Sequence, residues 1–533
     1  MSQFSPSGPR KRCAQMVALV LVSSTLSLGF TGCGGAGRTP KEAHGDAAER
    51  AHAPGVVDFN AQNAETYGAI VENEFRSPLV EPRSTFSSEV NTASYANVRR
   101  FLTQQNQLPP RDAVLLAEMV NYFPYKYPAP TGDNPVSLTL DLAPCPWKPE
   151  HKLARIGVRA KDIAANEMPA RNLVFLIDVS GSMSQENRLP LVKKSLNLLV
   201  DRLNAKDRVS IVTYASGVSL KLTPTAGDRK QTIRDAVNSL GAGGGTNGEG
   251  GIQLAYEVAR RSFLEGGANR VILCTDGDFN VGVSNQSDLR QLIEKERTSG
   301  VYLSVLGFGM GNYKDATLKD LATHGNGQHA YIDTIDEAKK LFVEQIGTLV
   351  CVAKDVKFQV EFNPARVTAY RLIGYENRLM KAEDFKNDAK DAGDMGAGHT
   401  VTALYEIVPA GVKMDLPSVD ATKYQKLAKV AVNIDEWLTV KMRYKQPTGD
   451  ASKEQAAMLT GSGTGAMSED FRFAAAVAEF GLVLRESTHK ANANLDAVIE
   501  RASGALGHDP HGHRAEFVEL VRKAKGLTDR AKE

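Results

Sequence analysis

The segment 172–350 alternates continuous apolar runs with amphipathic helical patterns, and few folds accommodate this alternation. The strand-like runs are Leu173–Ile177, Val209–Tyr214, Val271–Thr275 and Tyr302–Phe308. The helical patterns between and after them are Leu189–Leu203, Arg229–Leu240, Gly250–Phe263, Ser287–Ser299, Asp315–His324 and Ile335–Leu349. Strands rich in Val, Ile and Leu over their whole length are typical of a parallel sheet that helices cover on both faces. We therefore predict an α/β domain with a doubly wound, mainly parallel sheet.

The regions on either side of this domain have different patterns. Residues 58–171 begin with helical patterns and end with strand-like runs, and residues 351–447 are rich in strands. The runs in the second region are Val356–Phe362, Val367–Leu372, Val401–Val408, Leu427–Asn433 and Leu438–Tyr444. Neither group of strands is large enough to close a core alone. We predict that residues 136–160 pack with residues 351–447 in one β-sandwich, into which the α/β domain is inserted.

The C-terminal part changes pattern once more. Residues 448–466 are polar and rich in Gly and Ser, which predicts a linker. Residues 467–533 are predicted to be helical, and Ser468–Glu486 has the clearest apolar stripe.

The N-terminal residues 1–33 have the pattern of an export signal. Three basic residues (Arg10, Lys11 and Arg12) precede an apolar core at Met16–Phe30, which is too short to span a membrane comfortably. The small residues before Cys33 resemble a bacterial lipobox, which implies that Cys33 is lipid-modified and that residues 34–57 form a flexible tether. A simple secretory signal with an incidental cysteine is the alternative. We expect a lipid-anchored protein of the bacterial cell envelope, on the outer membrane or on a periplasmic or cell-surface face.

The charge balance and the cysteine content limit the kinds of protein that this chain could be. Lys and Arg number 64 and Asp and Glu 62, and a net charge of +2 gives no reason to expect a nucleic-acid partner. Outside the export segment the cysteines are Cys145, Cys274 and Cys351. Three widely spaced cysteines allow one disulfide but no disulfide framework.

Polar side chains at strand ends define one candidate site. Asp178, Ser180 and Ser182 follow the first apolar run, Asp276 follows the third, and Thr246 lies in the glycine-rich loop 241–248. Ligands sit outside the carboxyl ends of parallel strands, so these side chains are expected to converge. All five are hard oxygen donors, which favour Mg²⁺, with Mn²⁺ or Ca²⁺ as alternatives. Five such ligands leave a coordination position open for a carboxylate.

This set of residues resembles the metal-ion-dependent adhesion site of von Willebrand factor type A (VWA) domains. The resemblance rests on Asp178-x-Ser180-x-Ser182, then Thr246, then Asp276 followed by glycine. It implies a doubly wound, Rossmann-like sheet and a glutamate or aspartate of a partner that completes the coordination. It also implies that both serines bind the metal directly, that Thr246 binds directly or through water, and that the two aspartates act through water.

The flanking regions resemble a narrower family. The segments Ser87–Leu102, Val120–Pro128 and Glu361–Arg378 are similar to bacterial VWA lipoproteins of the YfbK kind. With the VWA motif they cover most of the chain beyond the tether. This resemblance implies an architecture, but it names no ligand or reaction.

Two other chemistries are disfavoured at the same loops. The residues Gly243, Gly245 and Gly248 have dinucleotide-fingerprint spacing, but a helical pattern precedes them and no P-loop lysine follows, so we expect no nucleotide. The sequence around Ser180 is not a nucleophile elbow, and 172–308 contains no histidine that could act as a base.

Two further features remain open. The loop residues His508, His511 and His513 have side chains able to bind a transition metal, although such a histidine-rich turn is more often simply solvated. Asp278 either stabilises the turn in which it lies or forms a hydrogen bond with one of the metal ligands.

The leading hypothesis is an envelope binding protein that captures an acidic residue of a protein partner through a divalent cation. We expect no catalytic residues and no enzymatic activity. The alternatives are an envelope enzyme that uses the metal as a Lewis acid and a scaffold whose metal only stabilises the fold.

Overall fold

The structure is a computed structural model that describes residues 65–89, 91–277, 279, 286–310, 314–414 and 435–531. The predicted export signal, the tether and the predicted strand Leu427–Asn433 lie outside the described residues. No helix within the described ranges is long and apolar enough to cross a membrane.

A six-stranded sheet forms the centre of the α/β segment, with the strand order β6-β5-β4-β7-β8-β9. In chain order its strands are β4 (Arg171–Asp178), β5 (Arg208–Tyr214), β6 (Val218–Ala226), β7 (Ala268–Thr275), β8 (Val301–Phe308) and β9 (His329–Ile332). All neighbours are parallel except β5 and β6, which are antiparallel. The predicted fold class, a doubly wound and mainly parallel sheet, is confirmed.

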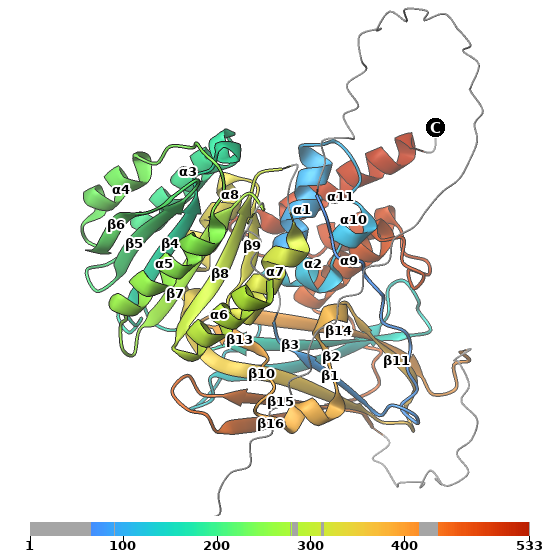
Figure 1. Cartoon of the computed structure of the whole chain (residues 1–533). Coiled ribbons are helices and arrows are strands. Elements are labelled where there is room, and N and C mark those ends of the chain that lie inside the picture. Colours follow the sequence, from blue (N-terminus) through green and yellow to red (C-terminus); the bar gives the residue numbers. More distant parts are fainter. Residues whose placement is uncertain are drawn as a thin grey trace, which may run out of the picture. The chain divides into compact units, whose positions relative to one another are not determined.

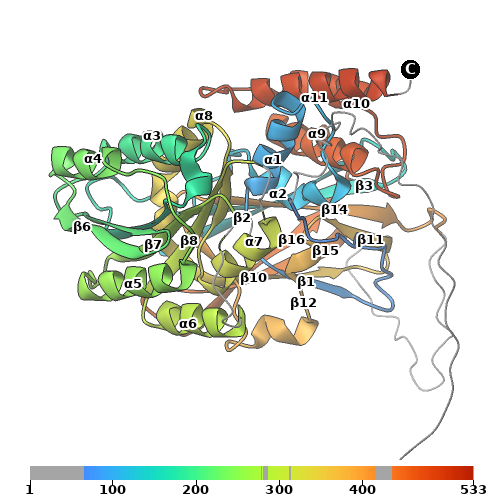
Figure 2. The same cartoon turned by 45° about the horizontal axis from the view of Figure 1, so that its top comes forward.

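Helices cover both faces of this sheet, as Figures 1 and 2 show. They are α3 (Leu189–Val200), α4 (Lys230–Asn238), α5 (Gly248–Arg261), α6 (Gln286–Thr298), α7 (Asp315–His324) and α8 (Ile335–Lys339). Alternate residues of β4 belong to two hydrophobic cores, one on each face of the sheet. Phe175 lies in the core with α3, α4 and α8, and Val174 and Leu176 lie in the core with α5, α6 and α7. Burial on both faces explains why these strands are apolar throughout.

Two antiparallel sheets enclose a separate core. One has the order β12-β1-β10-β15-β16, with β13 paired to β10, and the other has the order β11-β14-β3-β2. Their strands are β1 (Arg83–Ser87), β2 (Val136–Pro144), β3 (Lys152–Ala160), β10 (Cys351–Phe362), β11 (Val367–Ile373), β12 (Leu379–Met380), β13 (Gly393–Gly396), β14 (Thr400–Pro409), β15 (Glu436–Lys445) and β16 (Ser452–Thr460). Strand β3, before the α/β segment, pairs with β14, after it, and Ile156 lies opposite Ala403. The α/β segment thus lies between strands of one sandwich.

Two predicted elements differ in the structure. Residues 448–466 are not a linker, because β16 pairs with β15 along Ser452–Thr460. Its residues are mostly exposed, as in an edge strand, so it lacks the apolar alternation that reveals a strand in the sequence. The predicted helix Ile335–Leu349 is divided into α8, a π-helical turn at Lys340–Glu344 and a 3₁₀ turn at Ile346–Leu349.

The remaining helices pack around a third core. They are α1 (Ala93–Thr103), α2 (Leu116–Asn121), α9 (Glu469–Leu484), α10 (Leu495–Ser503) and α11 (His513–Arg530). Aromatic side chains join the N-terminal and C-terminal helices, since Phe123, Phe473 and Phe517 make edge-to-face contacts with one another. The region therefore combines residues from both ends of the described chain.

Candidate metal centre

The carboxyl ends of β4 and β7 bring the two predicted aspartates to one edge of the sheet. These strands are parallel neighbours, and Ile177 lies opposite Cys274. Asp178 is the last residue of β4, and Asp276 comes directly after β7. Both side chains are buried, which is unusual for carboxylates unless partners satisfy them.

Asp178 is held by contacts from the loop that follows it and from the last residue of β7. The backbone N–H of Ser180 donates to its Oδ1 at 2.8 Å, and the hydroxyl of Thr275 lies 3.5 Å from its Oδ2. Burial raises the pKa of Asp178 to about 6, although hydrogen bonding to Ser180 opposes the shift, and the charge of Asp276 adds to it. The site thus holds two carboxylates close enough to influence each other.

The two serines present their hydroxyls side by side. A 3₁₀ turn at Gly181–Ser184 curls the chain after Ser180, and the Oγ atoms of Ser180 and Ser182 are 3.0 Å apart. Adjacent ligands of an octahedral Mg²⁺ at about 2.1 Å from the ion are about 3 Å apart. The spacing of the hydroxyls therefore fits two neighbouring ligands of one ion.

The glycine-rich loop packs against the serine loop. The N–H of Gly181 donates to the carbonyl of Gly244 at 3.0 Å, and the N–H of Gly243 donates to the carbonyl of Val179 at 2.7 Å. Gly244 has φ +85°, and a Cβ there would lie 2.7 Å from Ser216 Oγ, so this close approach requires glycine. Thr246, which is half-buried, follows two residues later.

Arg188 is a member of this site that the motif did not reveal. Its Nη1 donates to Asp276 Oδ2 and to the carbonyl of Ser182, both at 2.7 Å, and its Nη2 donates to the carbonyl of Met310 at 2.6 Å. Arg188 immediately precedes α3 and links three loops at the sheet edge. An arginine ten residues after Asp178 carries no recognisable spacing signal, and only the fold places it here.

The donor set fits a hard divalent cation. Asp178, Ser180, Ser182, Thr246 and Asp276 supply only oxygen ligands, and the hydroxyl spacing agrees with octahedral coordination. The cation would supply a positive charge with exchangeable coordination positions. Arg188 already neutralises one carboxylate, so these side chains suit a weakly held rather than a fully enclosed ion.

The other predicted features have different outcomes. Asp278 lies outside the described residues. His511 Nδ1 and His513 Nε2 contact the two carboxylate oxygens of Glu344 at 3.2 and 3.0 Å. Within the described residues no three His, Cys, Asp or Glu side chains are grouped as a metal site, and this includes the loop with His508. Cys145, Cys274 and Cys351 are all free thiols.

Comparison with known proteins identifies the family. A family model described as "von Willebrand factor type A domain" matches residues 172–344, and "Uncharacterized protein YfbK, C-terminal" matches residues 347–527. A third, "von Willebrand factor", matches residues 61–155. The protein named "Uncharacterized protein YfbK" of Escherichia coli (strain K12) is 44% identical over 471 residues, which is 87% of this chain and 81% of that protein. The chain belongs to the YfbK family. Its α/β segment is a VWA domain.

Other similar proteins have lower sequence identity to this YfbK-family chain. Human "Inter-alpha-trypsin inhibitor heavy chain H4" is 30% identical over 166 residues, which is 30% of this chain and 18% of that protein. The solved structure "von Willebrand factor type A from Catenulispora acidiphila" is 14% identical, with a TM-score of 0.39 over 73% of this chain and 89% of that chain.

Proposed function

We propose that this chain is a cell-envelope binding protein, anchored by a lipid on Cys33. Its VWA domain holds Mg²⁺, with Mn²⁺ or Ca²⁺ as alternatives, through Asp178, Ser180, Ser182, Thr246 and Asp276. The observation that carries the proposal is the 3.0 Å spacing of the two serine hydroxyls beside a pair of buried carboxylates.

The charges around this site favour an acidic partner. Arg188 offsets Asp276, so a bound divalent cation leaves the site with roughly one net positive charge. An incoming glutamate or aspartate would then gain both a metal contact and a favourable field. The role is recognition of a protein side chain rather than catalysis.

Metal binding and partner capture are tested separately. Isothermal titration with Mg²⁺, Mn²⁺ and Ca²⁺ is expected to show one site that Asp178→Asn and Ser182→Ala abolish, whereas the exposed control Asp450→Asn leaves it intact. In crosslinking of native envelopes, a partner is expected to be captured with Mg²⁺ and lost with EDTA. Capture that survives both EDTA and Asp178→Asn would overturn the proposal, provided that circular dichroism shows the variant to be folded.

The lipid anchor has its own test. Mass spectrometry of the mature N-terminal peptide is expected to show acylation of Cys33, and Cys33→Ser is expected to release the protein from membranes. An unmodified Cys33 in the mature protein would instead support a simple secretory signal.

A further inference from the structure

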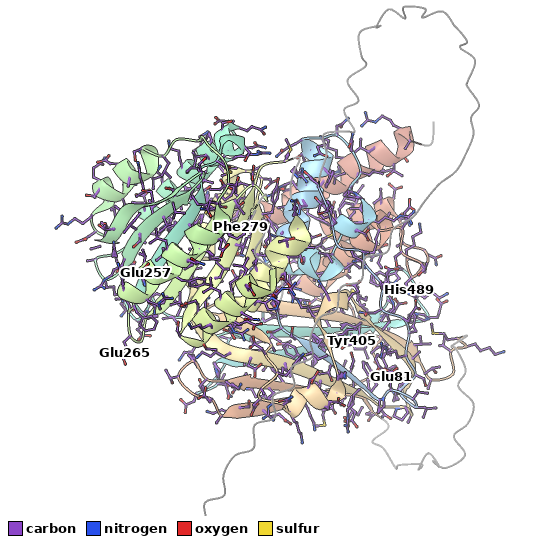
Figure 3. The ribbon with its side chains drawn as sticks, viewed as in Figure 1. Glu81, Glu257, Glu265, Phe279, Tyr405 and His489 are labelled. Carbon is purple, nitrogen blue, oxygen red and sulfur yellow. The ribbon has the colours of Figure 1, made fainter. Side chains whose placement is uncertain are left out.

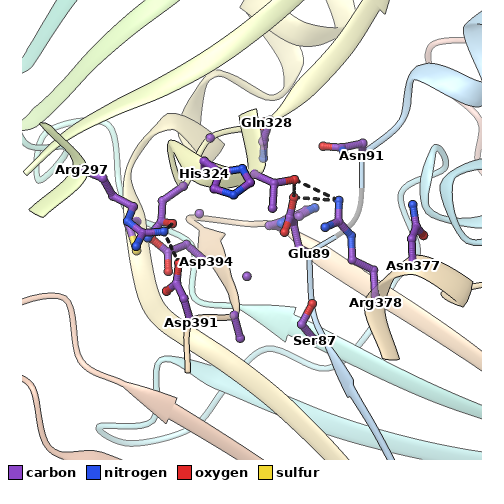
Figure 4. A pocket seen from close by; sticks show the side chains of 18 of the residues that line it. Ser87, Glu89, Asn91, Arg297, His324, Gln328, Asn377, Arg378, Asp391 and Asp394 are labelled. Atoms are coloured by element: carbon purple, nitrogen blue, oxygen red, sulfur yellow. Dashed lines mark hydrogen bonds and ion pairs between the residues drawn. The ribbon is translucent and has the colours of Figure 1, made fainter. Parts of the chain in front are cut away.

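A cavity of about 420 Å³ lies at the opposite end of the VWA sheet from the candidate metal centre. It is lined by the segment before α1, by the amino end of β7 and by the segment around β13 (Figure 4). Arg270 lines it from the third residue of β7, whereas Asp276 follows the end of that strand, roughly 20 Å further along. The two sites are therefore separate.

Arg270 is a buried cation in this cavity, and its side chain is not matched by a carboxylate. The residue is 4% exposed, its Nε donates to the carbonyl of Leu349 at 2.9 Å, and its Nη1 donates to Ser304 Oγ at 3.1 Å. Among the described residues it forms no ion pair, and its guanidinium carbon lies 5.5 Å from the centre of the Tyr302 ring. Burial lowers the pKa of the guanidinium. A charge in such surroundings is costly unless an anion joins it.

Asp394, on β13, lines the same cavity, and one of its carboxylate oxygens accepts no hydrogen bond from the described residues. Its Oδ1 accepts a hydrogen bond from the N–H of Asp355 at 3.1 Å, whereas its Oδ2 is buried without a partner among the described residues. Burial raises the pKa of this carboxyl to about 7. Arg270 and Asp394 thus influence each other through space but do not form an ion pair.

The other charged side chains labelled around the cavity largely form ion pairs with one another. Arg297 pairs with Asp391, and Arg378 pairs with Glu89 at 2.8 Å (Figure 4). Two neutral polar atoms remain buried without a described partner, Asn91 Nδ2 and His399 Nδ1. Burial lowers the pKa of His399 to about 4, so its ring is neutral near pH 7.

Glycines allow these segments to meet. A Cβ on Gly393 would lie 2.4 Å from the backbone nitrogen of Glu89, and a Cβ on Gly396 would lie 2.0 Å from the carbonyl oxygen of Thr348. Side chains at either position would separate the walls of the cavity. The close approach places one unmatched cation and one partly matched acid in a space large enough for a small ligand.

We propose that this cavity binds a small zwitterion of the α-amino-acid type, with its carboxylate on Arg270 and its ammonium group on Asp394. Asn91 and His399 offer further hydrogen bonds to polar atoms of the ligand. A zwitterion satisfies both unmatched groups at once, whereas a simple anion or a simple cation satisfies one. The inference does not depend on the metal centre.

The test uses the full chain in detergent, with EDTA present so that the metal centre does not contribute. Each common L-amino acid, D-alanine and D-glutamate is screened by thermal shift, and hits are measured by calorimetry. At least one amino acid is expected to bind, and its decarboxylated amine and deaminated acid are expected to bind at least about tenfold more weakly. Absence of binding by every amino acid would overturn the proposal and indicate that water satisfies these polar atoms.

Variants locate the binding. Arg270→Gln and Asp394→Asn are each expected to weaken it by about tenfold or more, whereas the exposed controls Arg261→Gln and Glu265→Gln leave it unchanged. Glu265 lies at the outer edge of the VWA domain (Figure 3). Asp394→Asn keeps an acceptor for the N–H of Asp355, so it remains a folded test if Arg270→Gln does not fold. Unchanged affinity in Asp394→Asn would overturn the proposed placement.

Discussion

Arg188 donates a hydrogen bond from Nη1 to Oδ2 of Asp276 at 2.7 Å, and the two side chains are only 7% and 1% exposed. The guanidinium therefore stands where a cation bound by the aspartate would also act. Without a metal ion, the guanidinium compensates the charge of the buried carboxylate. With a metal ion bound, the guanidinium adds positive charge beside the coordination position that is open to a partner. This pair links the stability of the sheet edge to the function proposed for it.

Replacing the arginine should make stability depend on the cation. In Arg188→Gln, Asp276 loses its ion pair with this guanidinium, and the free energy of unfolding in EDTA should fall by about 3–5 kcal/mol, as for other broken buried ion pairs. Mg²⁺ should restore much of this loss because it replaces the missing charge. Calorimetry with and without Mg²⁺ measures the difference, with Arg261→Gln as the exposed control. An equal response to Mg²⁺ in wild type and Arg188→Gln would contradict the charge argument.

Gly309 controls the position of Arg188 from the end of β8. It has φ +78°, and a Cβ there would lie 2.4 Å from Arg188 Nε. Gly309→Ala should therefore cost the conformational penalty of about 1 kcal/mol and, in addition, displace the guanidinium from Asp276. Gly132→Ala is the matched control, because Gly132 has φ +63° with nothing within 4 Å of a Cβ. Urea unfolding should show a larger loss for Gly309→Ala, and equal losses would mean that Arg188 adjusts without cost.

The α/β fold was predictable because its signal is local. Leu173–Ile177 is apolar at every position since both faces of β4 are buried, and such runs are visible without knowledge of the tertiary structure. Strand β16 gave no such signal, because an edge strand buries little and its sequence resembles a loop. The short strand β9 was missed for a related reason, since four residues are too few for a periodicity.

The candidate metal centre was only partly predictable. The motif around Asp178 has fixed spacing, but the roles of its five residues as metal ligands stay a prediction. Arg188, Gly309 and Thr275 join the site through tertiary contacts between separate loops, which no spacing encodes. The same holds for Arg270 and Asp394, which are 124 positions apart in the sequence and face one cavity.

Arg99 connects the VWA domain to the flanking helices, and its loss should be costly. From α1 it donates to Asp333 and Glu337 of the VWA domain, the latter at 2.7 Å, and to Glu516 of α11 at 3.1 Å. Arg99→Ala removes the ion pair of the buried Asp333 and one of the charges that stabilise Glu337, so the free energy of unfolding should fall by about 3–5 kcal/mol. The exposed pair Arg76–Glu81 provides the control, and Arg76→Ala should cost less than about 1 kcal/mol. Similar losses for both variants in urea unfolding would refute the importance of this network.

Asp394 should make stability fall as the pH rises. Its folded pKa of about 7 lies above the ordinary value of 3.8, so between these values the folded protein binds more protons than the unfolded chain. The favourable contribution is complete below about pH 4 and is lost as the pH rises through about 7. Asp394→Asn removes this titration. At about pH 8 and without added amino acid, the free energy of unfolding of the variant should exceed that of wild type by more than about 1 kcal/mol.

The comparison at two pH values separates this charge effect from a packing change. The difference between the Asp394→Asn variant and wild type in urea unfolding should be much smaller at about pH 4 than at about pH 8, because at the lower pH the wild-type carboxyl is neutral in the folded protein and only about half ionised in the unfolded chain. Glu265→Gln, at an exposed position, should show no such dependence. A constant difference at both pH values would mean that the substitution acts through packing rather than through the charge of Asp394.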